Sequence, residues 1–200
     1  MNLLRYARVA GILLALAGCS LGQPIPQAKT YLIEPPPPAT VMDRRPQTLR
    51  MGRVRVAPAF AGLPLVVRVD GVRYTADFYH TFIAEPGDLI GPRMAEWLAQ
   101  AGPFLTVLQP EATTPAAYAL EAVVTELYGD FSPNRPPMAV MTVQFTLVDL
   151  QGLTPRTQLE RTLGRRIELA EATPDALVRG YGQALGEILT ELAPQLLPPG

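Results

Sequence analysis

The chain has 200 residues, of which 48% are hydrophobic, with 17 basic and 18 acidic side chains. A nearly neutral chain without runs of like charge argues against nucleic acid as a partner. The length suits one domain with a sizeable core, and a second domain is not expected.

The first segment has the layout of a secretory signal peptide. Arg5 and Arg8 precede an apolar run, residues 9–17, which falls short of the roughly 20 residues that a transmembrane helix needs. The run ends in Leu16-Ala17-Gly18-Cys19, which matches the bacterial lipobox. The match implies cleavage between Gly18 and Cys19 and attachment of lipid to the Cys19 thiol, with enough acyl chains for stable anchoring. The alternative is an uncleaved or conventionally cleaved signal peptide with an incidental cysteine.

The residue after the cysteine bears on which membrane holds the protein. Ser20 follows Cys19, whereas in the sorting rule known for enterobacteria an aspartate at that position retains lipoproteins in the inner membrane. We therefore expect lipid anchoring in the bacterial outer membrane, facing the periplasm, with inner-membrane anchoring as the alternative. Cys19 is the only cysteine, so the mature chain can form no internal disulfide.

Residues 19–48 are expected to form a lipidated N-terminus and a proline-rich tether. Pro24, Pro26 and the run Pro35-Pro36-Pro37-Pro38 favour a stiff, extended backbone. Within this segment, Tyr31-Leu32-Ile33 has the residue types of a short edge strand that could dock onto the domain.

The folded domain is predicted over residues 49–197. It begins with Arg53-Val54-Arg55-Val56, in which charged and apolar residues alternate as in a strand with one buried face, and Pro58 ends this strand. Residues 65–69 and 74–83 flank Asp70-Gly71, a dipeptide that suits a tight turn because glycine accepts positive φ. The pattern predicts a β-hairpin.

A helix is predicted next, over residues 88–102. Its apolar residues recur at helical spacing, Gly102-Pro103 supplies a stop, and Pro92 should confine or kink the first turn. Residues 104–108 are then predicted to form a buried strand.

Three long strands follow, at residues 118–128, 138–150 and 158–169, with loops at 129–137 and 151–155; they predict an antiparallel meander. The last helix begins at Thr173 as N-cap with Pro174 in the first helical position. Its apolar stripe is expected to pack on the sheet, with membrane contact as the less favoured alternative because the polar face lacks basic residues. We predict an α+β fold, a single domain with a mainly antiparallel sheet packed against two helices.

The order of these features along the chain is similar to that of a known protein family. A lipobox is followed by Tyr31-Leu32-Ile33, by Gly52-Arg53-Val54-Arg55-Val56-Ala57-Pro58 and by Phe78-Tyr79-His80-Thr81-Phe82 before the Trp-bearing helix, three strands and a terminal helix. This order resembles the ABC-type transport auxiliary lipoprotein component family, which includes PqiC-like proteins. The resemblance covers nearly the whole chain, and its motifs are short and mainly structural.

The resemblance implies an accessory function in lipid transport. Members assist an ABC system, with permease, ATPase and an MCE-domain protein, that moves phospholipids, sterols or related lipids between the two membranes. A ring or other homo-oligomer, and contact with lipid, are further implications of the family.

The residue types that chemistry needs are sparse. The only lysine, Lys29, lies in the predicted tether, so no P-loop is present. One histidine and one cysteine predict no zinc site, and we expect no metal and no cofactor. Gly180, Gly182 and Gly186 follow no strand and are expected to permit close packing of the last helix rather than dinucleotide binding. We therefore expect a protein that is not an enzyme.

Two residues keep an enzyme hypothesis open. Ser132 could approach His80 through folding, although no nucleophile-elbow sequence surrounds it. For His80 a packed structural role is the main interpretation, and contact with an MCE partner is the functional alternative.

Partner contact is assigned to two loops, because loops carry recognition and because arginines and aromatics carry interface energy. The candidates are Asp70 and Arg73 in the hairpin turn and Phe131 and Arg135 in the loop 131–137, with solvated turn residues as the alternative interpretation. Three functions remain in view: a lipid-transport auxiliary, an outer-membrane structural or assembly lipoprotein that supports a β-barrel or lipopolysaccharide insertion, and a periplasmic enzyme.

Overall fold

The computed structural model describes residues 27–196, so the predicted signal peptide, Gly18 and Cys19 lie outside the described residues. The strands are β1 (Lys29–Tyr31), β2 (Arg45–Met51), β3 (Arg55–Val56), β4 (Pro64–Asp70), β5 (Arg73–Phe82), β6 (Phe104–Leu108), β7 (Tyr118–Asp130), β8 (Met138–Asp149) and β9 (Arg156–Glu168). The helices are α2 (Pro86–Ala101) and α3 (Pro174–Leu192), with 3₁₀ turns at Pro58–Phe60 and Ala193–Leu196. Neither α2 nor α3, nor any other helix within residues 27–196, is long and apolar enough to cross a membrane.

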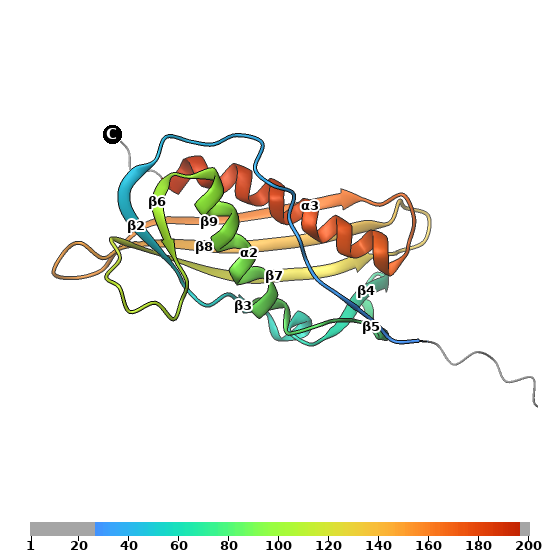
Figure 1. Cartoon of the computed structure of the whole chain (residues 1–200). Helices are drawn as coiled ribbons and strands as arrows, with labels where there is room; N and C mark the ends of the chain where they lie inside the picture. Colours follow the sequence, from blue (N-terminus) through green and yellow to red (C-terminus); the bar gives the residue numbers. More distant parts are fainter. Residues whose placement is uncertain (1–26, 197–200) are drawn as a thin grey trace, which may run out of the picture.

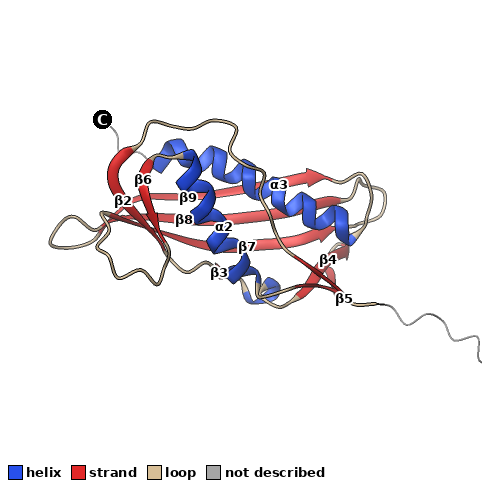
Figure 2. Cartoon of the chain, in the orientation of Figure 1, coloured by secondary structure: helices blue, strands red, loops and turns tan. Residues whose placement is uncertain are grey.

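The predicted meander of three long strands is confirmed. β7 pairs antiparallel with β8, and β8 pairs antiparallel with β9, over almost their full lengths. Val143 and Phe145 on β8 are fully buried, whereas Gln144 between them is exposed, because alternate side chains point to opposite faces. Both helices lie on one face of this sheet (Figure 2). The core therefore fills the space between the meander and α3.

The sheet as a whole is mixed and mostly parallel, so the prediction of a mainly antiparallel sheet was wrong. Five pairings are parallel (β1 with β5, β2 with β6, and β2, β3 and β4 with β7), and three are antiparallel. The reason is that three short strands follow one another along the same edge of β7, all in its direction. Their registers are Leu49↔Tyr118, Arg55↔Val123 and Val67↔Gly129. Side-chain alternation predicts which face of a strand is buried, but it does not predict which strand pairs with it or whether the two run parallel.

The predicted hairpin and both helices are confirmed, with small shifts at their ends. β4 and β5 are antiparallel around the turn at Gly71. The Thr173 hydroxyl accepts a hydrogen bond from the Ala176 N–H (3.3 Å) and caps α3. α2 begins at Pro86 and continues through Pro92, and Gly102 closes it at φ 78°.

The proline-rich segment lies against the helices rather than apart from them (Figure 1). Ile33 is fully buried, and the Trp97 Nε1–H donates to the Pro36 carbonyl oxygen (3.0 Å). A Cβ on Gly182 would overlap the Glu34 carbonyl oxygen, and one on Gly186 would lie 2.8 Å from the Pro36 Cδ. These glycines permit close packing, as predicted.

One buried polar group in the core leads to a test of stability. Tyr181 on α3 is 1% exposed, and its hydroxyl has no hydrogen-bond partner among residues 27–196. Burial raises the pKa of this phenol well above its ordinary value, so the group stays neutral. Because an unpartnered buried hydroxyl costs free energy, we expect Tyr181→Phe to raise the unfolding free energy by about 1 kcal/mol.

Thermal unfolding followed by circular dichroism measures this effect. A gain of that size corresponds to a Tm increase of about 2–4 °C. Tyr74→Phe is the control, because Tyr74 is 43% exposed, and its Tm should change little. A clear fall in Tm for Tyr181→Phe would contradict the absence of a partner for its hydroxyl.

Candidate functional site

The two loops that the sequence predicts for partner contact meet at one end of the sheet. Arg68 at the end of β4 stands opposite Asp130 at the end of β7, and the Phe131 N–H donates to the Arg68 carbonyl oxygen (2.8 Å). The turn of residues 70–73 and the loop of residues 131–137, together called the loop cluster below, border a hollow of about 280 Å³. Its lining comprises Arg68, Asp70, Gly71, Ser132, Pro133 and Arg135.

The turn side of the loop cluster is exposed and charged. The Arg73 guanidinium contacts the Asp70 carboxylate at 2.7 Å, and both side chains are more than half exposed. Gly71 adopts φ 28°, the positive value expected of a glycine in a tight turn. An exposed ion pair of this kind contributes little stability, so both side chains remain available to a partner.

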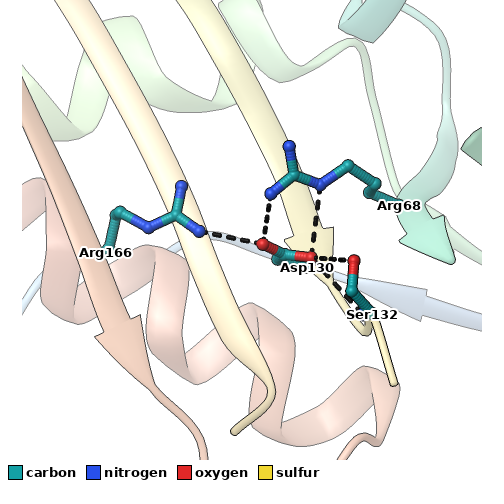
Figure 3. A network of polar contacts seen from close by, with 4 residues as sticks. All are labelled: Arg68, Asp130, Ser132 and Arg166. Atoms are coloured by element: carbon teal, nitrogen blue, oxygen red, sulfur yellow. Dashed lines mark hydrogen bonds and ion pairs between the residues drawn. The ribbon is translucent and has the colours of Figure 1, made fainter. Parts of the chain in front are cut away.

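The loop side is held by a buried carboxylate (Figure 3). Asp130 is 3% exposed and is the one buried charged residue in the described part of the chain. The Arg68 guanidinium donates to both of its oxygens, and Arg166 on β9 donates to Oδ2 at 2.9 Å. The Ser132 hydroxyl donates to Oδ1 at 2.7 Å. This one carboxylate therefore ties together β4, β7, β9 and the start of the loop.

Contacts within the network shift the pKa of two of its members. Hydrogen bonds from the Arg68 guanidinium, with smaller contributions from Ser132, hold the pKa of Asp130 well below its usual range. The same contact raises the pKa of Arg68, which also lies over the Tyr128 ring at 5.2 Å from its centroid. Two arginines around one carboxylate leave the network itself with a net positive charge, and the exposed Arg135 lies in the adjoining loop.

Phe131 and His80 differ in position from the other predicted partner residues. Phe131 belongs to the loop cluster but is half-buried against the core. His80 lies near the other end of β5, where its Nδ1 is 2.7 Å from an Asp77 carboxylate oxygen. The structure therefore brings together Asp70, Arg73, Phe131 and Arg135, and it places His80 apart from them.

The two residues that kept an enzyme hypothesis open bind different carboxylates. Ser132 donates to Asp130, and the His80 ring contacts Asp77. Within residues 27–196, no group of three or more His, Cys, Asp or Glu side chains is placed to hold a metal ion. The arrangement at Asp130 is that of a structural anchor beneath an exposed, charged loop.

The roles of Asp130, Arg68 and Arg166 were not predicted. Gly129-Asp130 looked like the beginning of a loop, because both residue types favour turns. The sequence feature that could have indicated a structural role for Asp130 is the serine two residues later. At this spacing an aspartate side chain often accepts hydrogen bonds from the residues that follow it. A single sequence does not indicate that this aspartate binds an arginine 62 positions away.

Comparisons with known proteins agree with this fold. Protein XCC0632 from Xanthomonas campestris has a solved structure that is 16% identical, with a TM-score of 0.67, over 82% of this chain and 90% of that one. Another uncharacterized protein of solved structure is 13% identical, also with a TM-score of 0.67, over 86% of this chain and 99% of that one. No curated protein matched the chain. At these identities the two structures show the fold alone.

The family model of the ABC-type transport auxiliary lipoprotein component matches residues 31–193. The chain belongs to this family. The auxiliary lipoprotein is therefore a component of an ABC-type transport system and carries a membrane anchor, and the match suggests that it is not an enzyme. The match includes both helices and the loop cluster of the auxiliary lipoprotein.

Proposed function

We propose that this auxiliary lipoprotein is held on the outer membrane, facing the periplasm, by lipid on Cys19. There it assists an MCE-type ABC system, with its permease and ATPase, that moves phospholipids or related lipids between the inner and outer membranes. The observation that carries the proposal is the family match over residues 31–193. The lipobox that ends in Cys19 supports the anchor, and Ser20 supports the choice of membrane.

The loop cluster is the surface that we assign to the transporter. Arg73 and Arg135 are exposed there, and arginine is among the residues that contribute most to binding at interfaces. The Asp130 network fixes the loop beneath them, so less conformational freedom is lost when a partner binds. The exposed arginines of the loop cluster suit acidic groups on the partner.

A charge reversal tests this assignment. We expect Arg135→Glu to reduce the amount of MCE protein and permease recovered with the tagged lipoprotein about fivefold to tenfold. Arg156→Glu is the matched control, because Arg156 is an exposed arginine at the start of β9, outside the loop cluster. Equal recovery with both variants would contradict the loop assignment.

The anchor is tested separately by membrane fractionation. Cys19→Ala should be lost from the outer-membrane fraction, because its lipid is the proposed anchor. Retention of Cys19→Ala in the outer membrane would contradict anchoring through this cysteine.

A further inference from the structure

Strand β5 carries a bulge that exposes two aromatic side chains. Leu65 pairs with Asp77 and the preceding Pro64 pairs with Thr81, so residues 78–80 have no counterpart on β4. The Asp77 carboxylate stabilises the bulge by accepting the Tyr79 and His80 N–H groups at 3.0 and 3.2 Å. As a result, Phe78 is 74% exposed and Tyr79 is 51% exposed.

Three more exposed apolar side chains come from neighbouring segments. Ile83 follows β5, and its N–H donates to the Tyr31 carbonyl oxygen beside Leu32 (3.1 Å). The Phe82 N–H donates to the Leu63 carbonyl oxygen (2.7 Å), which places Leu63 at the same end of the hairpin. These five residues, called the aromatic edge below, are Leu32, Leu63, Phe78, Tyr79 and Ile83. Several exposed apolar side chains on adjoining segments mark an interaction surface more often than single exposed ones do.

The chain connects the aromatic edge to the proposed lipid anchor. β1 is paired with β5, and the described chain enters the body beside β5 (Figure 1). Gln27 is the first described residue, and it follows Cys19 by only eight positions. Eight residues span at most about 29 Å even when fully extended. Lipid on Cys19 therefore keeps this end of the body close to the bilayer.

We propose that the aromatic edge docks on the bilayer that holds the Cys19 lipid, with Phe78 and Tyr79 in the interface between headgroups and acyl chains. The proposal rests on the Cys19 anchor proposed above. Tyrosine and phenylalanine suit this interface, where Tyr keeps its hydroxyl in water and its ring among lipid. Because a short tether gives an effective concentration in the millimolar range, a weak contact is enough for lasting docking.

The aromatic edge and the loop cluster occupy different parts of the same hairpin. β4 and β5 are antiparallel, so the turn at Asp70 and Arg73 lies at the other end of the hairpin from Phe82. Docking of the aromatic edge therefore leaves the turn that we assign to the transporter outside the proposed lipid contact.

Tryptophan fluorescence in vesicles tests the docking. The full lipoprotein, with its lipid, is reconstituted into phosphatidylethanolamine and phosphatidylglycerol vesicles that contain lipids brominated at known acyl positions. The test variant is Phe78→Trp, and Ile83→Trp is a second variant should the first fail to fold. Val72→Trp is the matched control, because Val72 is 94% exposed but lies in the loop cluster. The wild type supplies the background from Trp97, which is 5% exposed.

We expect Phe78→Trp to shift its emission to the blue and to lose intensity with brominated lipid. Bromine near the headgroups should quench it more than bromine at the chain ends, because interfacial side chains reach only about 5–10 Å deep. Val72→Trp should not be quenched. A blue shift of Phe78→Trp without quenching would assign the aromatic edge to contact with a second copy of the chain, and no change at all would leave it in water; either result overturns the proposal.

Flotation of the same vesicles separates the two proposals. If Phe78→Trp floats with the vesicles but is not quenched, the result supports the Cys19 anchor and contradicts only the docking. Wild-type lipoprotein that does not float contradicts the anchor itself.

Discussion

Replacement of Asp130 by asparagine is expected to lower the free energy of unfolding by about 2–4 kcal/mol at neutral pH. The carboxylate is buried between Arg68 and Arg166, and asparagine supplies no charge to either guanidinium. The corresponding fall in Tm is about 5–12 °C for a protein of this size. Asp43→Asn is the matched control, since Asp43 is an exposed aspartate, and its Tm should change by much less.

The pH dependence of this effect has a definite sign. The pKa of Asp130 is lowered in the folded protein, whereas an aspartate in the unfolded chain has a pKa of about 3.9. Its contribution is therefore complete above about pH 5 and is lost as the pH falls below 4 toward the folded pKa. The Tm difference between wild type and Asp130→Asn should shrink over that acid range. A difference that stays constant between pH 7 and pH 3 would contradict the proposed ionic role of Asp130.

Replacement of Gly182 by alanine is expected to destabilise the protein by about 1–3 kcal/mol, although alanine favours helices by about 1 kcal/mol over glycine. The added Cβ would overlap the Glu34 carbonyl oxygen, so the proline-rich segment has to move away from α3. Hydrogen exchange of residues 30–38 should rise together with the fall in stability, because the segment loses its contact with the helix.

Gly91→Ala is the control for this substitution, because Gly91 is also a buried glycine within a helix. Its added Cβ would lie 3.4 Å from a Val54 methyl group, an ordinary contact, so this variant should be neutral or slightly stabilised. Equal effects of the two substitutions, measured by chemical denaturation, would contradict the close approach at Gly182.

The predictions from sequence succeeded where the signal is local. Thr173 caps α3, Asp70-Gly71 turns between β4 and β5, and over residues 141–147 of β8 buried side chains alternate with more exposed ones. Each of these features depends on residues a few positions apart, whose spacing is fixed by the geometry of a helix, turn or strand. The glycines of α3 were likewise understood as packing positions, since no strand precedes them.

The features that the sequence did not predict depend on distant neighbours. Three short strands, β2, β3 and β4, each run parallel to β7. The residues of these strands do not indicate whether the pairing is parallel or antiparallel. Four consecutive prolines look like an exposed spacer, yet Trp97, 61 positions from Pro36, binds its carbonyl oxygen. The candidate site was predicted in its loops, whereas the Asp130 network beneath them depends on three separate strands.

The most direct test of the proposed function is to purify the tagged wild-type lipoprotein from detergent-solubilised membranes and identify the bound proteins by mass spectrometry. We expect an MCE-domain protein together with an ABC permease and its ATPase. Recovery of a β-barrel alone, or of no partner from intact envelopes, would contradict it.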